Sequence, residues 1–457
     1  MARAALLLAL LLGAASAFPA PDDLIVVIGD VTATGALLHV RPAGPDPVSI
    51  VLEPDPPGEP ATLAAAPDAG GVARVALSDL APGRRHRYRI VAGGAAVDGE
   101  FVTAPAPDRA APVRLLWSGD LGSRRRCAAR RYGVFDAMAT RRPDLFVFAG
   151  DTVYADHSCP ALEGGQGAAR THEEFLARYR HNLGDAAVQR LLRRTSVTAI
   201  WDDHEVRGDF SGRTERVMPA GRAAFLDAWP VDTPPGDPTR LYRARRWGAL
   251  LEVFVLDTRQ YRSPNHRRDG PDKTMLGPGQ RQWVVDSVAS SSAVWKVVVS
   301  SVPLSLPKGW FVSDSWAPGS VLGHRTGFAH ERDAILAALA AAGVRNLVVL
   351  AADAHFAAAI AHAPGPGFAF WELIAGPLAA GTKHPREPAP GLGSRVLFAD
   401  GGAATFGELD VGAEALDVRF FAGDGRLLWA HRLPASRARR HPGRRARGRP
   451  GPPPTGI

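Results

Sequence analysis

Two different hydrophobic patterns divide this chain. Between residues 24 and 103, short runs rich in β-forming residues alternate with clusters of turn-forming residues. The runs cover residues 24–28, 36–40, 48–52, 72–77 and 88–91. Short strands at such regular spacing are typical of a small antiparallel β-sandwich. A segment rich in proline and alanine, residues 103–112, closes this unit.

From Val113 onward, apolar runs alternate with helical patterns, which predicts a sheet covered by helices. The run 144–151 shows this most clearly, because five apolar residues end abruptly in Gly150 and Asp151, as in a buried parallel strand. Further strands are predicted at 113–120, 197–201, 250–257, 295–301 and 346–351, and helices at 132–140 and 331–342. The runs 368–374, 404–411, 416–421 and 427–433 are expected to be short strands that close a second sheet.

The net charge of +8 on 457 residues would by itself suggest a nucleic-acid partner. However, residues 436–457 hold seven arginines and no acidic residue, and Arg3 lies near the amino terminus, so the remainder is close to neutral. We therefore expect no nucleic-acid partner for the folded body. The proline and glycine content of residues 436–457 predicts a disordered basic tail.

Residues 1–17 have the pattern of a cleavable signal peptide, with Arg3, an apolar stretch at 4–12 and small residues at 15–17. No later run is apolar and long enough to span a membrane, so we expect an exported, soluble protein, periplasmic or extracellular. In an oxidising compartment, Cys127 and Cys159 are expected to form a disulfide bond. Two free thiols, or a cysteine that binds metal, are the alternative.

Polar residues follow four of the predicted strands. They are Asp120, then Asp151 with Tyr154, then residues 202–205, and last Asp353 with His355. One aspartate after a buried strand is often only the N-cap of the next helix. Carboxylates, a phenol and imidazoles that meet at one sheet edge instead suit two metal ions, with one carboxylate bridging them.

Five motifs occur in order: Gly-Asp-x-x-Tyr at 150–154, Trp-Asp-Asp-His-Glu at 201–205, Leu-Asp-Thr-Arg-x-Tyr-Arg at 256–262, Leu-Gly-x-x-Gln at 276–280 with Trp283, and Ala-Asp-x-His at 352–355. This set resembles the alkaline phosphatase D (PhoD-like) family of calcineurin-like metallophosphoesterases. The resemblance implies an α/β metallophosphoesterase-type two-sheet sandwich flanked by helices, preceded by a small all-β, fibronectin type III-like sandwich. The expected organisation is a signal peptide at 1–17, the β-sandwich at 22–106, the catalytic domain at 110–435 and the tail at 436–457.

Position by position, the resemblance implies metal ligands at Asp120, Asp151, Tyr154, Asp203, Asp353 and His355. Asp151 would bridge two or more ions, and Tyr154 would bind Fe(III), since a phenolate is a hard donor; Ca(II) would be the other ion. Asp120 stands where the best-known family members have a cysteine, and Ala352 where the family usually has glycine. The alternative for Tyr154 is a packed loop aromatic.

The same resemblance implies that His204 contacts the phosphate or protonates the leaving oxygen, and that Arg207 binds phosphate oxygens. The alternative for His204 is to support the ligands by hydrogen bonding. Asp202, Asp257 and Arg259 are expected to brace the site rather than to bind metal. Trp310 and Trp316 could line the cleft or anchor its loop.

The function implied is that of an exported metal-dependent phosphoesterase, which hydrolyses phosphate monoesters, diesters or both by attack of a metal-bound hydroxide on phosphorus. A phospholipase D-type phosphodiesterase of the same family is one alternative, because both reactions would use the same ions. A non-catalytic extracellular binding protein is the alternative from another class.

Overall fold

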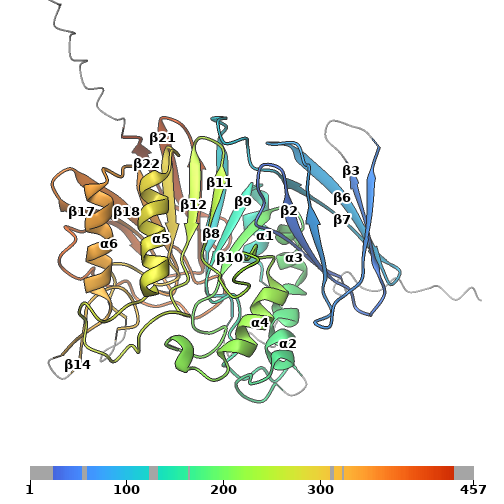
Figure 1. The fold of residues 1–457 in the computed structure, drawn as a ribbon, viewed down its shortest axis with the longest axis horizontal. Helices are drawn as coiled ribbons and strands as arrows, with labels where there is room; N and C mark the ends of the chain where they lie inside the picture. The colour runs from blue at the N-terminus through green and yellow to red at the C-terminus, as the bar shows by residue number, and fades with distance from the viewer. Residues whose placement is uncertain are drawn as a thin grey trace, which may run out of the picture.

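The computed structural model describes residues 24–53, 59–122, 132–162, 165–308, 313–321 and 324–436. The predicted signal peptide, Cys127, Trp310 and the tail beyond Ser436 lie outside these described residues. Figure 1 shows the amino-terminal strands at one end of the molecule and helix α6 (Ala329–Ala341) towards the other.

Two large sheets and two small ones hold the strands. The first large sheet has the order β22 (Leu427–Pro434), β21 (Ala415–Ala422), β20 (Thr405–Val411), β8 (Val113–Ser118), β9 (Leu145–Ala149), β10 (Ser196–Ile200), β1 (Ile25–Gly29), β2 (Ala36–Arg41) and β5 (Ala73–Leu77). The second has the order β11 (Arg243–Trp247), β12 (Leu251–Val255), β13 (Trp295–Val299), β16 (Leu347–Ala351), β18 (Phe368–Ile374), β17 (Ala357–Gly365) and β19 (Arg395–Asp400). The small sheets are β4 (Ala61–Ala65), β3 (Val48–Glu53), β6 (Arg85–Ala92) and β7 (Ala95–Val102), and the pair β14 (Gly319–Val321) and β15 (His324–Thr326).

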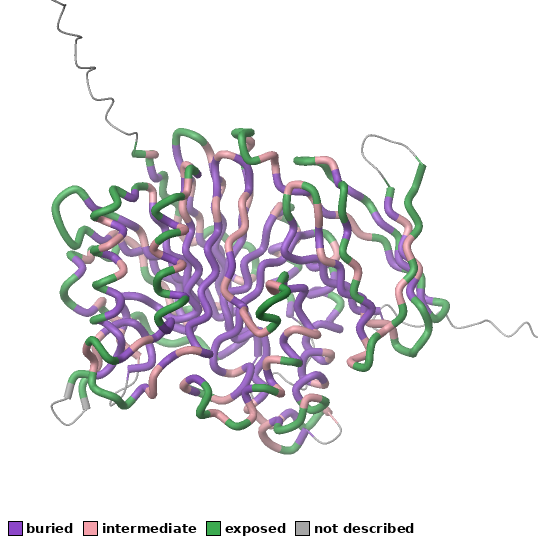
Figure 2. The backbone as a smooth tube through the Cα atoms, in the orientation of Figure 1, coloured by how far each residue is buried: buried purple, intermediate pink, exposed green. Residues whose placement is uncertain are grey.

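The helices lie on the outside of these sheets. They are α1 (Val134–Thr140), α2 (His172–Leu183), α3 (Ala186–Leu192), α4 (Met218–Ala228), α5 (Gly277–Ser290) and α6. Figure 1 shows α5 and α6 side by side over the second sheet, where their apolar side chains share a core with β12, β13 and β16. Buried residues concentrate along the strands of both large sheets, as Figure 2 shows.

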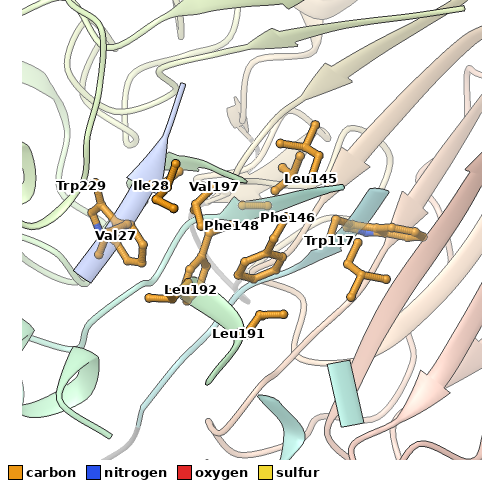
Figure 3. Close-up of a cluster of buried hydrophobic side chains, with 14 of the residues drawn as sticks. Val27, Ile28, Trp117, Leu145, Phe146, Phe148, Leu191, Leu192, Val197 and Trp229 are labelled. Carbon is orange, nitrogen blue, oxygen red and sulfur yellow. The ribbon is translucent and has the colours of Figure 1, made fainter. Parts of the chain in front are cut away.

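A single hydrophobic core joins the first sheet to its helices and to the facing sheet. Figure 3 shows part of it, where Phe146 and Phe148 of β9 lie among side chains of α3, β1 and β10. The rings of Phe148 and Trp229 meet edge to face, with centroids 5.4 Å apart. The strands β9, β10 and β16 are buried at every position, and β9 and β16 accordingly read as continuous apolar runs.

The predicted fold class is therefore confirmed: an all-β amino-terminal region precedes a two-sheet α/β fold flanked by helices. The sheet assignment of the last strands is wrong, however. Only the run 368–374 enters the second sheet, as β18, whereas β20, β21 and β22 join the first sheet beside β8. Gly407 of β20 lies against the ring of Trp117 of β8, and this packing fixes the pairing.

The amino-terminal β-sandwich is continuous with the first large sheet. Its strands β1, β2 and β5 form one layer, and β1 pairs in parallel with β10 through Gly29 and Val197. The other layer consists of β3, β4, β6 and β7. The Tyr88 hydroxyl of β6 fixes this layer to the segment after α3, because it donates to the Arg193 carbonyl at 2.8 Å. The sequence predicted the sandwich but not this continuity, because apolar patterns do not specify which strand pairs with which.

Candidate metal centre

The predicted site residues lie where the strands of both large sheets end. Asp120 follows β8, Asp151 follows β9, residues 202–205 follow β10, and Asp353 follows β16. Parallel strands that run together bring their carboxyl ends to one edge, so the acids of one sheet meet there. The backbone N–H of Asp353 donates to Oδ1 of Asp120 at 3.2 Å, which joins the two sheets at this edge.

The backbone at these positions takes an uncommon conformation. Asp120, Asp151, Asp353 and His355 have φ values of 62°, 51°, 62° and 61°, in the left-handed region that residues other than glycine rarely adopt. Such strain clusters at functional sites. Gly150, with φ of 103°, allows the close approach that this turn needs, because a Cβ there would lie 2.7 Å from the Cβ of Asp202.

At this sheet edge, four buried carboxylates each keep one oxygen without a hydrogen-bond partner among the described residues. These atoms are Oδ2 of Asp120, Oδ2 of Asp151, Oδ1 of Asp203 and Oδ2 of Asp353. None of the four residues is more than 3% exposed. Buried polar atoms are nearly always satisfied, so four such oxygens in one place need a common partner, and a cation is the partner that carboxylates take.

Ligand atoms converge in three groups that share Asp151, one of which is Asp151, Asp203 and His204. The other two are Asp120, Asp151 and His355, and Asp151, Asp202, Asp203 and Asp353, with the ligand atoms of each group within 4.8 Å of one another. A carboxylate with two oxygens can serve more than one group at once. The residues present therefore fit more than one metal ion, and Asp151 offers a carboxylate oxygen to each of these groups.

The electrostatics of the site also call for cations. Burial raises the pKa of Asp151 well above its usual range, and the charges of Asp203 and Asp202 raise it further. The pKa of Asp120 is raised in the same way, by burial and by Asp353. Cations would remove this cost, because they favour the charged form of each carboxyl group.

Tyr154 and His355 complete the group that contains Asp120. The Tyr154 hydroxyl lies 3.2 Å from Nε2 of His355. Nδ1 of His355 lies 2.6 Å from the Gly381 carbonyl, which can only accept, so Nδ1 carries the proton and Nε2 accepts from the Tyr154 hydroxyl. Burial and the charge of Lys383 lower the pKa of His355 to about 4, so the ring is neutral near pH 7, as a metal ligand requires.

His204 lies beside Tyr154, with ring centroids 4.1 Å apart and planes at 20°. Its Nδ1 is held by both oxygens of Asp156, at 2.9 and 3.0 Å. Burial lowers the pKa of His204, but the carboxylates of Asp203 and Asp156 outweigh this effect and raise the pKa to about 9. Asp156 was not among the predicted site residues, because no strand or motif marks it.

Asp202, Asp257 and Arg259 lie at the base of the site. Asp202 belongs to one converging group, yet Nε and Nη2 of Arg259 bind its two oxygens at 2.7 and 3.0 Å, and Ser301 donates to it at 2.6 Å. Asp257 accepts from the Trp201 indole at 2.9 Å and from the backbone of Arg259 at 3.1 Å. These contacts connect the three residues to one another and to the loops around the site, and their bracing role stays a prediction.

Two loop residues absent from the predicted set also enter the site. Lys308 places Nζ 2.6 Å from Oδ1 of Asp353, and both Lys308 and Arg259 contact Oδ2 of Asp314, at 3.1 and 2.9 Å. Burial raises the pKa of Asp203, but Lys308 and Arg259 outweigh it and hold that pKa well below its usual range. Asp314 lies two residues before Trp316 in the loop noted in the sequence, which was the only signal for it.

Two further residues named from the sequence, Arg207 and Trp316, lie among the described residues. Arg207 is half-buried, and its guanidinium makes one hydrogen bond within the described residues, to the Val206 carbonyl at 3.3 Å. It pairs with no described carboxylate. Trp316 is buried, and its indole donates to Ser300 at 3.0 Å, so it anchors the loop.

Comparisons with known proteins agree with this geometry. A model of the PhoD-like phosphatase family matches residues 123–409, more than half of the chain. Alkaline phosphatase D of Bacillus subtilis (strain 168) is 26% identical over 329 residues, which cover 64% of this chain and 55% of that protein. The chain thus spans about half the length of this curated relative.

Solved structures share the fold. A structure of PhoD matches 93% of this chain and 94% of its own, at 18% identity and a TM-score of 0.72. The purple acid phosphatase PPD1 from seeds of yellow lupin (Lupinus luteus) matches 90% of this chain and 74% of its own, at 12% identity and a TM-score of 0.59. With the family model matched across the site just described, this chain belongs to the PhoD-like phosphatase family.

Proposed function

We propose that this protein is a metal-dependent phosphoesterase that hydrolyses phosphate monoesters, diesters or both. The observation that carries the proposal is the set of four carboxylate oxygens that accept no hydrogen bond from the described residues, on Asp120, Asp151, Asp203 and Asp353, gathered at one sheet edge. Bound there, a pair of metal ions would supply a water-derived nucleophile near neutral pH and offset negative charge on the phosphate.

The donor set supports Fe(III) in the group with Tyr154 and Ca(II) in the group with Asp353. Fe(III) is a hard ion that suits phenolate and carboxylate oxygen, and Tyr154 contacts His355, whose Nε2 lies 3.9 Å from Oδ1 of Asp120. Asp203 and Asp353 offer only carboxylate oxygens, which suit Ca(II). Asp151 would hold both ions in place.

Two side chains would act on the substrate directly. His204 is oriented through Nδ1 by Asp156, which leaves Nε2 to donate a proton to the departing oxygen. Arg207 has no carboxylate partner among the described residues and would bind the equatorial phosphate oxygens. Neither role needs a nucleophile from the protein.

Export and the disulfide bond also belong to this proposal. Export is supported by the sequence pattern of residues 1–17. Within the part of the chain that the structure describes, no helix is long and apolar enough to span a bilayer. Cys159 is buried and, among the described residues, no cysteine is free, which supports a bond from Cys159 to Cys127.

The test is elemental analysis of natively purified protein, followed by assays with p-nitrophenyl phosphate and bis-p-nitrophenyl phosphate. We expect iron and calcium in the protein, hydrolysis that a chelator abolishes and added ions restore, and a rate ratio that identifies the preferred ester. Less than half an equivalent of any metal, with no activity after reconstitution, would contradict the proposal and favour a binding protein.

A further inference from the structure

A buried carboxylate outside the metal centre holds the chain that leads into it. Glu372 of β18 is completely buried, and its carboxylate accepts hydrogen bonds from the backbone N–H groups of Leu304 and Ser305. The Ser305 hydroxyl donates to the same carboxylate. Both residues belong to the loop that follows β13. Three bonds from adjacent residues to one buried carboxylate restrict this backbone strongly, because a broken bond would leave polar atoms unsatisfied.

His362 of β17 pairs with Glu372. Nε2 of His362 lies 3.1 Å from Oε2 of Glu372, and neither side chain is exposed. Nδ1 of His362 lies 3.0 Å from Oγ of Ser394, which directly precedes β19. Burial raises the pKa of Glu372, but the contacts with His362 and Ser305 outweigh it and lower that pKa below its usual value. Glu372 is thus ionised near neutral pH and can only accept, so Nε2 of His362 donates to it.

Every backbone carbonyl from residue 304 to residue 307 also accepts a hydrogen bond from elsewhere in the structure. The donors are Nη1 of Arg332 to Leu304 at 2.9 Å, the N–H of Ala389 to Ser305 at 2.8 Å, Oγ of Ser315 to Leu306 at 2.8 Å and Nη1 of Arg386 to Pro307 at 2.8 Å. The ring of Pro307 fixes its own φ as well. We call residues 304–307 the clamped segment, because these bonds leave its backbone little freedom to move.

Lys308 follows the clamped segment directly and enters the metal centre. Its Nζ lies 2.6 Å from Oδ1 of Asp353 and 3.1 Å from Oδ2 of Asp314, and its side chain is only 17% exposed. Asp353 is a proposed metal ligand whose Oδ2 has no hydrogen-bond partner among the described residues. A shift of the clamped segment would therefore move Lys308 and change the orientation of the Asp353 carboxylate.

We propose that Glu372, held by His362, is a positioning residue for the metal centre, because it fixes the clamped segment and so places Lys308 against Asp353. Catalytic groups must be held within about 0.5 Å of their productive positions, which requires a rigid support of this kind. The inference rests on the proposed function, and it assigns a role to a residue that lies outside all five sequence motifs.

The experiment compares the full-length, natively purified protein with Glu372→Gln, Lys308→Met and the double variant. Glu408→Gln is the matched control, because Glu408 is equally buried but lies on β20 and pairs with Arg141 and Arg419. Hydrogen–deuterium exchange at the amides of residues 304 and 305 measures whether the clamped segment is held, independently of activity. Values of kcat and KM for p-nitrophenyl phosphate then form a double-mutant cycle between Glu372 and Lys308.

We expect Glu372→Gln to exchange the two amides about tenfold faster than the wild type. It should also lower kcat by about 10- to 100-fold with a smaller change in KM, because the reacting groups are misplaced. The double variant should have a kcat no lower than that of Lys308→Met alone, since Glu372 acts through Lys308. Glu408→Gln should change neither the exchange at these amides nor kcat.

Unchanged exchange at these amides or an unchanged kcat in Glu372→Gln would overturn the proposal, as would losses of kcat that multiply in the double variant. If Glu372→Gln does not fold, His362→Gln removes the partner of Glu372 and is measured in the same cycle, with the same expected directions. A wild type that hydrolyses neither chromogenic ester contradicts the proposed function, whereas the exchange rates still test the role of Glu372, so the two failures are distinguishable.

Discussion

At the scale of single residues, the site concentrates acidic side chains that are unfavourable in the absence of cations. Asp151 is the extreme case, because it is 1% exposed and lies among carboxylates that raise its pKa. Its backbone is held in the left-handed region as well. The acidic site thus lowers the folding stability of the metal-free protein in exchange for binding metal ions, as functional sites often require.

Replacement of Asp151 tests this balance. Asp151→Asn should abolish hydrolysis and remove the rise in melting temperature that metal ions produce, because the proposed bridging ligand is lost. In chelator-treated protein the same change should raise the melting temperature by a few degrees, since a buried charge is replaced by a neutral amide. Differential scanning calorimetry with and without chelator measures both effects.

The control for this variant is Asp98→Asn, at an exposed ion pair with Arg89. It should change neither the metal-free stability nor the effect of metal ions. A stripped Asp151→Asn protein that melts well below the wild type would show that the Asp151 charge is already compensated by other contacts.

The charge of His204 gives a prediction of pH dependence. Asp203 and Asp156 raise the pKa of His204 from 6.5 to about 9. The stabilisation from this charge is therefore fully present below pH 6.5 and is lost as the pH rises through about 9. In chelator-treated protein, Asp156→Asn should lower the free energy of unfolding by about 1–2 kcal/mol at pH 6 and have little effect at pH 10.

Denaturant titrations at the two pH values measure this difference. Asp156 also accepts from the backbone N–H of Gly208 at 2.9 Å, and an asparagine oxygen can still accept that bond. An equal loss of stability at pH 6 and pH 10 would mean that Asp156 acts only through the Gly208 turn.

The residues that the sequence revealed share one property. Asp120, Asp151 and Asp353 each follow a continuous apolar run, so the strand pattern itself located them. Asp156 and Lys308 lie in loops, where no periodicity marks a position, and only the three-dimensional arrangement relates them to the site. The strand pattern therefore located the residues of the predicted ligand set, whose role as metal ligands stays a prediction, whereas the charged residues that surround them could not be found from the sequence.

At the scale of elements, hydrophobic runs predicted where the buried strands lie in the sequence, but not which strands pair with each other. The run 404–411 became β20 almost as expected, but in the first sheet instead of the second. Its partner strand β8 lies far earlier in the chain: Ser118 and Thr405, which are hydrogen-bonded, are 287 positions apart. A local hydrophobic pattern does not show which strands pair over such a separation. The long helices α2 and α5 were not delimited either, because Arg178 and Gln280 on their buried sides interrupt the apolar stripe.

The β8–β20 pairing depends on the absence of a side chain at Gly407. A Cβ there would overlap the ring of Trp117, which is fully buried. Gly407→Ala should therefore lower the free energy of unfolding by more than about 2 kcal/mol, measured by urea titration. Gly365→Ala in β17 is the control, because nothing lies within 4 Å of its added Cβ. Equal effects of the two changes would exclude this packing as the cause.

At the scale of the whole molecule, the amino-terminal β-sandwich and the α/β fold share a sheet and a core. The domain boundary near residues 106–110 remains a prediction from sequence, and the contacts across it are strong. The Gln189 side chain accepts from the backbone of Val26 at 2.9 Å, and Arg193 donates to the Leu24 carbonyl at 2.8 Å. These bonds hold α3 against β1, so we expect the β-sandwich and the α/β fold to unfold together.

Asp30 is a buried carboxylate that joins several elements across this boundary. It follows β1 and is completely buried, and its Oδ2 accepts from Nε of Arg243 at 2.6 Å and from Nη2 of Arg245 at 2.9 Å, both on β11. Arg243 in turn donates to the Ala199 carbonyl of β10 at 2.9 Å. The strands β1, β10 and β11 are thus held by one buried ionic network.

Asp30→Asn should leave Arg243 buried without a counter-charge and lower the free energy of unfolding by about 3–5 kcal/mol in a single cooperative transition. Asp232→Asn is the control, because Asp232 also contacts Arg245, at 3.0 Å, but is 59% exposed and should contribute at most about 1 kcal/mol. Urea titration followed by both fluorescence and far-ultraviolet circular dichroism measures the two variants. If Asp30→Asn instead gave two separate transitions, the sandwich would be a module that only docks on the α/β fold, because a fused sheet cannot lose one layer alone.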